Sequence, residues 1–468
     1  MSQLDAVLGR IDSDLDKSLE RLFALLRIQS ISTDPAYKKF CREAAEFVAT
    51  DLNRIGFSAE LRPTAGHPIV VGKPSNGAAS QRSKSGPPHV LFYGHYDVQP
   101  VDPLNLWTAP PFEPKIDTLP DGRKIIVARG ACDDKGQAMT FIEACRAYKA
   151  VTGKLPLPIT MMIEGEEECG SKNLFGFVRD NADEFKLDLA LVCDTAMWDQ
   201  NTPAITSSLR GLVYEEVKLT CADRDLHSGL FGGAAQNPIR VLSKILAALH
   251  DENGRVTIPG FYDGVKDLPP DIKEELKALN LTAENFLGQV GLKEPAGEKG
   301  RMLIEMVTTR PTAEINGIVG GYTGEGAKTV LPAKASAKVS FRLVGDQDPL
   351  QVRNAFRAFV KERLPVDCTV EFENFSDARA LQLPFDSPAL AKTRAALKDE
   401  WGKTAVTVGA GGSIPIVNDF KSVLGMDSIM VGFALDDDRV HSPNEKFDLK
   451  SFHKGIRSWA RILDALSA

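Results

Sequence analysis

The sequence predicts an α/β protein in which a smaller α+β domain is inserted into a larger, discontinuous α/β domain. Apolar strand-like segments alternate with helix-like segments in residues 89–193 and again after residue 386, which is typical of a sheet covered by helices on both faces. Between these regions, residues 213–221 and 335–344 alternate apolar and polar side chains, as strands with one solvated face do. We therefore place the domain segments at residues 1–207, 208–385 and 386–468.

The individual elements follow from the spacing of the apolar residues. Residues 3–28 and 38–56 have helical spacing and predict two amphipathic helices. In the first segment, strands are expected at residues 89–94, 124–128, 157–163 and 189–193, with a helix at 136–151. In the middle segment, helices are expected at 237–250 and 350–363 and a further strand at 368–373. The last segment should end in an amphipathic helix at 450–466.

Composition excludes several classes of protein. The 468 residues are 43% hydrophobic and 25% charged, which are ordinary globular proportions and exclude a disordered, collagenous or coiled-coil chain. The net charge of −7 offers no electrostatic footprint for nucleic acid or anionic lipid. No apolar run approaches the roughly 20 residues that cross a bilayer. We expect neither a nucleic acid nor a membrane as partner.

The cysteines and the N-terminal residues indicate the compartment. The seven cysteines are odd in number, scattered and never spaced C-x-x-C, so neither a disulfide framework nor a thiolate zinc site is predicted. This usage favours a reducing compartment. The first 14 residues interleave acids with apolar residues and lack the basic and then apolar pattern of a signal peptide. The sequence therefore predicts a cytoplasmic protein.

Acidic residues and histidines gather just after predicted strands. In open α/β sheets, ligands bind at the carboxyl ends of the strands. Five segments have this placement, with two histidines (His95 and His441) and many carboxylates among them: residues 94–97, 130–136, 163–171, 191–194 and 436–445. We expect these segments to meet at one edge of a single sheet.

Each segment has a structural and a functional interpretation. Asp97 lies two residues after His95, so in an extended chain it can accept a hydrogen bond from one ring nitrogen and leave the other for a metal. The pair could equally be a satisfied strand end. Asp133 and Asp134 could cap a helix, and Asp194 could be a turn residue. Four carboxylates within residues 164–168 repel one another unless cations balance them, which favours the functional interpretation.

Together these residues predict metal-assisted hydrolysis. Imidazole and carboxylate donors without thiolate suit zinc, manganese or cobalt in a catalytic site. Surplus carboxylates favour two metal ions bridged by one of them, and a further carboxylate would serve as general base. The residues alone do not indicate which bond is cleaved.

The motifs resemble those of metallopeptidase family 20, the family of acetylornithine deacetylase, succinyl-diaminopimelate desuccinylase and the carnosinase-like cytosolic dipeptidases. The matching stretches run in the family's order: FYGHYDVQP (92–100), RGACDDKGQ (129–137), EGEEECGS (164–171), VCDT (192–195), DLHSGLFGG (225–233), GGSIPIV (411–417) and HSPNEK (441–446). The long acidic motif and HSPNE indicate the dipeptidase branch. The resemblance implies a three-layer α/β/α zinc-hydrolase domain with an inserted two-layer α+β lid that also forms a homodimer.

The resemblance also implies a role for each motif residue. Two zinc ions per subunit are expected, one held by His95 and Asp194, the other by Glu168 and His441, with Asp133 bridging them. Asp97 would orient His95. Glu167 would be the general base that activates a metal-bridging water. The peptide bond between Asp133 and Asp134 would be cis.

Residues of the lid are implied in substrate binding. His227 would reach the partner subunit's active site and bind the oxyanion, although a turn histidine is the structural alternative. Arg342 would bind the substrate's free carboxylate through its planar guanidinium, with an ordinary surface salt bridge as the alternative. Thr329, Gly412 and Ser413 would line the same pocket.

Two departures from the family pattern affect specificity and stability. Gly409 and Ala410 stand where carnosinase relatives have Arg-Glu, so one charged contact near the substrate terminus is missing and carnosine-like specificity is in doubt. Cys169 replaces a Ser or Thr of the acidic motif and is expected to be tolerated, though sensitive to oxidation.

The expected function is a di-zinc hydrolase that cleaves dipeptides or very short peptides. The first alternative is an N-acyl-amino-acid amidohydrolase with the same two-metal mechanism. A catalytically silent dimeric binding protein would have lost Glu167 or a ligand, and none is lost. A two-metal phosphoesterase would need more basic residues near the acids than Lys135 and Arg439.

Overall fold

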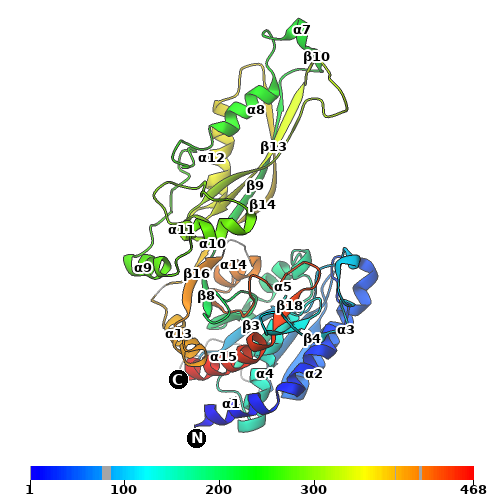
Figure 1. The fold of residues 1–468 in the computed structure, drawn as a ribbon, viewed down its shortest axis with the longest axis vertical. Helices are drawn as coiled ribbons and strands as arrows, with labels where there is room; N and C mark the ends of the chain where they lie inside the picture. The colour runs from blue at the N-terminus through cyan, green and yellow to red at the C-terminus, as the bar shows by residue number, and fades with distance from the viewer. Residues whose placement is uncertain (1, 76–85, 385, 411–413) are drawn as a thin grey trace. The chain divides into compact units, whose positions relative to one another are not determined.

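The computed structural model describes residues 2–75, 86–384, 386–410 and 414–468 (Figure 1). The chain forms two compact units, which we describe separately. Unit 1 contains Met1–Ser207, Leu383–Thr407 and Asp419–Ala468, and unit 2 contains Ser208–Gln382 and Val408–Asn418. Among the described residues, no helix is both long enough and apolar enough to cross a membrane.

A nine-stranded mixed sheet organises unit 1. Its order is β1-β2-β6-β3-β7-β17-β8-β15, and β16 also pairs with β8. The central strands β6, β3, β7 and β17 are parallel. The strands are β1 (Phe57–Arg62), β2 (Ile69–Pro74), β3 (Val90–His95), β6 (Ile159–Glu164), β7 (Leu189–Val192), β8 (Ala204–Leu209), β15 (Leu381–Gln382), β16 (Val406–Ala410) and β17 (Asp427–Met430).

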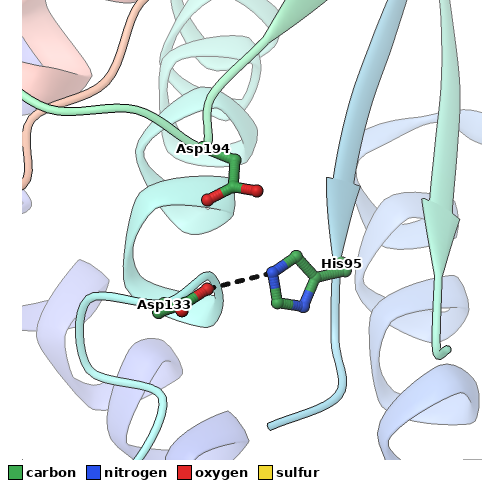
Figure 2. Close-up of side chains that lie close together, drawn as sticks. All are labelled: His95, Asp133 and Asp194. Carbon is green, nitrogen blue, oxygen red and sulfur yellow. Dashed lines mark hydrogen bonds and ion pairs between the residues drawn. The ribbon is translucent and has the colours of Figure 1, made fainter. Parts of the chain in front are cut away.

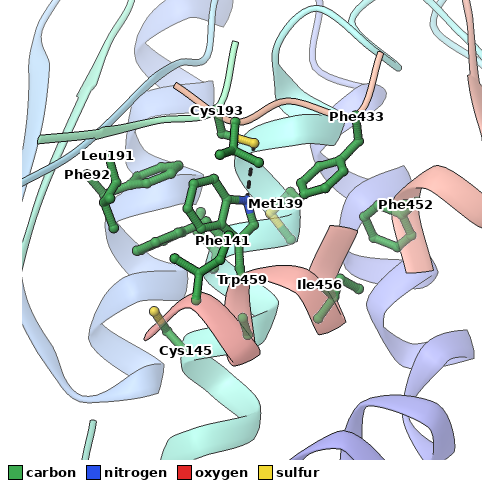
Figure 3. Close-up of a cluster of buried hydrophobic side chains, with 14 of the residues drawn as sticks. Phe92, Met139, Phe141, Cys145, Leu191, Cys193, Phe433, Phe452, Ile456 and Trp459 are labelled. Carbon is green, nitrogen blue, oxygen red and sulfur yellow. Dashed lines mark hydrogen bonds between the residues drawn. The ribbon is translucent and has the colours of Figure 1, made fainter. Parts of the chain in front are cut away.

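Helices cover both faces of this sheet. On one face, Phe92 of β3 stacks on Phe141 of α4 (Lys135–Thr152) with ring centroids 3.8 Å apart, and Trp459 of α15 (Leu449–Ser467) meets both rings edge-on (Figure 3). The next residue, Tyr93, meets Phe420 of α14 (Pro415–Ser422) edge-on at 5.8 Å. Because successive strand residues point to opposite faces, α14 covers the other face. The predicted α/β fold is confirmed.

The remaining helices of unit 1 correct one prediction. Residues 3–28 form two helices, α1 (Gln3–Ser13) and α2 (Leu15–Leu26), because the backbone of Asp14 leaves the helical region at φ −103° and ψ 10°. The buried ammonium of Lys135 donates to the main-chain oxygens of Leu25 and Ile28 and so satisfies the C-terminal end of α2. The others are α3 (Lys38–Ile55), α5 (Leu174–Asp180), α6 (Ala182–Phe185) and α13 (Pro388–Trp401).

The strand predicted at 124–128 lies in a second sheet. Strands β4 (Lys115–Thr118), β5 (Lys124–Val127) and β18 (Lys446–Asp448) form a small antiparallel sheet of their own. The prediction that all the acidic segments follow strands of one sheet is therefore wrong for residues 130–136. Sequence periodicity identified the strand, but its pairing depends on β18, more than 300 residues further along the chain.

Unit 2 is a four-stranded antiparallel sheet with helices packed against it. Its order is β11-β13-β9-β14, and β9 and β13 alternate buried and half-exposed side chains. The strands are β9 (Gly211–Thr220), β11 (Thr312–Gly320), β13 (Lys334–Leu343) and β14 (Thr369–Ala378), with β10 (Leu226–His227) and β12 (Val330–Leu331) in a separate pair. The helices are α7 (Ser228–Phe231), α8 (Pro238–Ala247), α9 (Pro270–Ala278), α10 (Ala283–Phe286), α11 (Leu303–Thr308) and α12 (Pro349–Glu362).

One disulfide in unit 2 differs from the expectation for cysteines. Cys221 and Cys368 are paired, whereas the other five cysteines are free. The register explains the pairing, since Thr220 of β9 lies opposite Thr369 of β14 and each cysteine is the next residue beyond. Spacing along the chain could not reveal this neighbourhood, because 147 residues separate the two thiols.

Candidate metal centre

His95 is the last residue of β3 and is completely buried. Its Nδ1 lies 3.1 Å from the main-chain oxygen of Asp97 and 3.3 Å from the Asp97 carboxylate. Both neighbours of Nδ1 are acceptors, so Nδ1 carries a proton and donates to Asp97. Nε2 faces the carboxylate of Asp133 at 3.1 Å (Figure 2). The ring is therefore oriented with Nε2 toward Asp133, as a metal ligand on this side would need.

Asp133 lies between two histidines. It belongs to the turn that precedes α4, and its peptide bond to Asp134 is cis, as predicted. One carboxylate oxygen faces Nε2 of His95 and the other faces Nε2 of His441 at 2.9 Å. Burial alone would raise the pKa of Asp133, but the hydrogen bonds from the two histidines hold it below its usual value. Its two oxygens are thus directed at two separate groups of donors.

These two groups of donors share Asp133. His95, Asp133 and Asp194 have ligand atoms within 4.8 Å of one another, and so do Asp133, Glu168 and His441. Asp194 follows β7 and points toward the other two residues of its group (Figure 2). In the second group, Nε2 of His441 lies 3.0 Å from the carboxylate of Glu168. Each group could hold one divalent ion, and Asp133 could bridge the pair.

The charges in this region fit positively charged ligands. Burial and then the charge of Asp133 raise the pKa of Asp194 to about 8. Burial also raises the pKa of Glu167 to about 7, against the lowering effect of His95. Hydrogen bonds to Asp133 and Glu168 raise the pKa of His441 to about 10. The raised pKa values reflect negative charge gathered in a buried place, which a cation would stabilise, and imidazole with carboxylate is a donor set for divalent metals.

The sequence profile of peptidase family M20/M25/M40 matches residues 91–465. The chain belongs to this family. The Cys-Gly metallodipeptidase dug1 of Schizosaccharomyces pombe is 30% identical over 99% of this chain and 98% of its own length. The human Beta-Ala-His dipeptidase is 28% identical over 98% and 91% of the two chains.

Solved structures agree with this membership. The di-peptidase Dug1p of Saccharomyces cerevisiae has a TM-score of 0.75 at 27% identity and covers 100% of this chain and 99% of its own. The metallo-carboxypeptidase Sso-CP2 of Sulfolobus solfataricus has a TM-score of 0.79 at 29% identity and covers 96% and 99%. This M20 chain is therefore a metal-dependent hydrolase. The predicted family is confirmed.

The acidic run of this M20 chain divides into two pairs with different surroundings. Glu164 accepts hydrogen bonds from the hydroxyls of Tyr93 and Ser171. Glu166 accepts them from the main-chain N–H of His67 and from the side chain of Asn173. Only Glu167 and Glu168, in the short helix Glu167–Cys169, remain directed at the donor groups. Glu164 and Glu166 thus bond to groups outside the donor sets, and the repulsion argument from sequence bears on the metal site through Glu167 and Glu168.

Glu445 is a buried carboxylate whose role the sequence did not reveal. It is completely buried and accepts hydrogen bonds from the main-chain N–H groups of Gly130, Cys132 and Asp133 at 3.1, 2.9 and 3.1 Å, and from the guanidinium of Arg129 at 2.7 Å. It lies four residues after His441, so it connects that segment to the turn that carries Asp133. Its place in the HSPNEK motif could have marked Glu445 as a functional residue, but the motif does not indicate which groups it binds.

The segment that carries His441 has an unusual backbone. Arg439, His441 and Asn444 have positive φ angles of 57°, 61° and 62°, a region that residues other than glycine rarely occupy. Asn444 fixes the segment from one side, because its side chain accepts from the N–H and hydroxyl of Thr108 and donates to the main-chain oxygen of Leu106. His441 itself is half-exposed and is directed by this backbone.

The predicted substrate residues lie in unit 2, at two ends of its sheet. His227 of β10 pairs with Val330 of β12, and the main-chain oxygen of Thr329 accepts from the Ser228 N–H. His227 and Thr329 therefore lie together at this two-stranded pair, beyond an end of the sheet (Figure 1). Strand β13 begins at Lys334, shortly after β12. Arg342 is near the other end of β13, about 26 Å from Lys334 at the usual rise per strand residue. Gly412 and Ser413 lie outside the described residues.

Proposed function

We propose that this chain is a dipeptidase that uses two divalent metal ions, most favourably zinc, to hydrolyse the amide bond of dipeptides or very short peptides. The observation that carries the proposal is the pair of donor groups sharing Asp133, with Glu167 beside them. The proposal is supported by relatives named Cys-Gly metallodipeptidase and Beta-Ala-His dipeptidase, which align over nearly the whole chain. Imidazole and carboxylate donors suit catalytic zinc, and also manganese or cobalt.

Two metal ions would be held by His95 and Asp194, by Glu168 and His441, and by Asp133 between them. When bound, they supply Lewis-acid activation of water and of the scissile carbonyl group. Asp97 accepts from Nδ1 of His95, so Nε2 is the ring nitrogen that would bind a metal ion. Glu445 and Arg129 hold the turn of Asp133 in place.

Glu167 is the general base of the proposed reaction. It accepts a proton from the attacking water and later gives that proton to the leaving amine nitrogen. Its burial and its raised pKa of about 7 suit a group that must both accept and return a proton near neutral pH. The carboxylate is a base only when ionised, and cations nearby favour that form.

Unit 2 would bind the substrate and form the homodimer. Arg342 binds the free carboxylate of the substrate. Nδ1 of His227 accepts the Gly229 N–H at 3.0 Å, so Nε2 carries the proton and can donate to the oxyanion. Because His227 and Arg342 lie at opposite ends of the sheet, we propose that they serve active sites of different subunits. Exposed Ile318 and Val319 on the edge strand β11 support pairing with a second copy.

The first test is cleavage of a mixed panel by protein loaded with zinc or manganese. Cysteinylglycine, β-alanylhistidine and N-acetylglycine are incubated with the protein, and product amines are followed by mass spectrometry with a chelator-treated control. Chelator-sensitive cleavage of the dipeptides supports the proposal. Cleavage of the acyl compound alone would replace it with an N-acyl-amino-acid amidohydrolase.

Mixing of inactive variants tests the shared active site. His227→Ala and Glu167→Gln subunits are each expected to have low kcat, whereas a mixture should regain activity through hybrid dimers in which one site has both residues. Activity is measured against the mixing ratio, with size-exclusion chromatography to show exchange. Exchange without any regained activity would place His227 and Glu167 in the same subunit's site.

A further inference from the structure

Arg210 is the single residue between β8 and β9, and it continues the alternation of β9. Gly211 is buried, and Arg210 and Leu212 on either side are half-exposed. Leu212 lies directly opposite Arg342 in the register of β9 and β13. Arg210 is thus a diagonal neighbour of Arg342 on the same face of the sheet, at a typical separation of about 7–8 Å.

Neither guanidinium has a partner within the part of the chain that the structure describes. No hydrogen bond or ion pair joins Arg210 or Arg342 to another described residue, and Nε of Arg210 is closed to solvent without an acceptor. Glu314, an exposed residue of β11, acts on Arg210 through its charge but forms no ion pair with Arg210 or Arg342. Burial and the charge of Arg342 lower the pKa of Arg210 to about 10.

Other arginines of unit 2 form ion pairs with acidic residues of the chain. Arg310 pairs with Glu298 at 2.8 Å, and Arg357 with Glu215 at 2.7 Å. Arg353 forms an ion pair with Asp377. In each case the chain supplies a carboxylate to a partly or fully buried guanidinium. For Arg210 and Arg342 it supplies none, and two like charges at neighbouring positions of one face repel each other. An external anion would remove that repulsion.

We propose that Arg210 and Arg342 together form a carboxylate subsite that binds the C-terminal carboxylate of a dipeptide, and that Arg210 is a second specificity-determining residue. A carboxylate accepts two parallel hydrogen bonds from a guanidinium, and two guanidinium groups on one face can engage both of its oxygens. The subsite rests on the proposed dipeptidase function. It adds Arg210 to the recognition of the free carboxylate, so that discrimination between a dipeptide and its amide depends on Arg210 as well as on Arg342.

The test compares cysteinylglycine with cysteinylglycine amide, which differ only in the terminal carboxylate. Arg210→Met should lower kcat/KM for cysteinylglycine by about 10- to 100-fold, the range for a hydrogen bond to a charged group. Its effect on the amide should stay below about threefold, because the amide already lacks the charge. Arg210→Lys keeps the charge without the planar fork and should fall between wild type and Arg210→Met.

A matched control and a binding measurement separate the possible outcomes. Lys338→Met removes a cation from β13 four residues from Arg342 and should leave kcat/KM unchanged for both substrates. Metal content and Tm show that the variants fold. Calorimetry with metal-loaded Glu167→Gln protein compares binding of the two compounds without turnover. Carboxylate preference in binding without cleavage by wild type would reject the dipeptidase function and keep the subsite. Equal losses for both substrates with Arg210→Met, or no carboxylate preference in binding, would overturn the subsite.

Discussion

Each unit brings together side chains of like charge, carboxylates in unit 1 and guanidinium groups in unit 2. The residues that surround the two groups differ. In unit 1, Asp133, Asp194 and Glu168 crowd around two histidines, and a buried network that includes Glu445 holds them. In unit 2, Arg210 and Arg342 are neighbours on one sheet face, without carboxylate partners among the described residues. Other buried arginines are paired with acids, as Arg129 is with Glu445 in unit 1 and Arg310 with Glu298 in unit 2. The comparison teaches that an uncompensated group of like charges marks a place for a ligand of opposite charge, cations in unit 1 and an anion in unit 2.

The largest expected effect comes from removing the shared carboxylate of unit 1. Asp133→Ala deprives both donor groups of a ligand at once, so we expect loss of both metal ions and a fall in kcat/KM of about 10³-fold or more. Metal content after dialysis and steady-state kinetics measure the two effects. Asp121→Ala removes an exposed acid outside the donor groups as a control. Two tightly held ions in Asp133→Ala would contradict the shared role.

Neighbouring acids of unit 1 should separate metal binding from proton transfer. Glu167→Gln is expected to retain both metal ions and to lose about 10²- to 10⁴-fold in kcat, because only the base is removed. Glu168→Gln, one residue further along, should lose metal from the group that contains His441. Metal analysis and kcat at saturating metal distinguish the two. Near wild-type kcat for Glu167→Gln would show that another group carries the proton.

A smaller effect should follow from weakening the support of the carboxylates. Glu445→Gln replaces one accepting oxygen by a donor, so the carboxamide cannot accept from all four N–H groups. We expect metal affinity to fall about 10- to 100-fold, with kcat largely restored by excess metal. Glu400→Gln alters a buried acid that pairs with Arg457 and Arg461 instead and should leave metal affinity unchanged. If excess metal fails to restore activity, the role of Glu445 is structural alone.

The smallest effect concerns a pair that the fold does compensate. Burial opposes the shift, but hydrogen bonds from Arg123 and Lys446 lower the pKa of Asp437 to about 2. A lowered folded-state pKa gives stability that is present above the ordinary value of 3.8 and is lost as pH falls through 2. Because Asp437 is half-exposed, Asp437→Asn should cost less than about 1 kcal/mol at pH 7.

Denaturant titrations at pH 7 and at pH 3 measure this difference in the free energy of unfolding between wild type and Asp437→Asn. The difference should shrink at the lower pH. Asp183→Asn is the control, since Asp183 is almost fully exposed beside Lys186. A difference that stays constant with pH would mean that the carboxylate charge contributes nothing there.

Much of unit 1 could be predicted because acidic residues and histidines at strand ends form a short pattern in the sequence. An apolar strand followed at once by His95 or Asp194 is a pattern within ten residues, and parallel strands bring such ends together. The break at Asp14 and the separate sheet of β5 could not be predicted, since they depend on backbone angles and on pairing with β18. The metal identity, the dimer and the cytoplasmic location stay predictions.

Contacts between residues far apart in the chain could not be predicted from the sequence for a different reason. The partners of Glu445 lie more than 300 residues earlier in the chain, and Cys221 and Cys368 meet only through the register of β9 and β14. Arg210 gave no signal either, because its significance is the absence of a carboxylate beside it among the described residues. Such information exists only once neighbouring strands are aligned.

The three-segment construction of unit 1 has a consequence for synthesis on the ribosome. Strand β17 pairs with β7 in the middle of the sheet, and Trp459 of α15 closes the aromatic cluster on Phe92 and Phe141. Both elements follow most of unit 2 along the chain, so the hydrophobic interior of unit 1 stays open to water until these later residues have been made. Most of unit 2 is one continuous stretch and can fold while the ribosome is still working. Chaperone demand should therefore fall on the N-terminal half of the nascent chain.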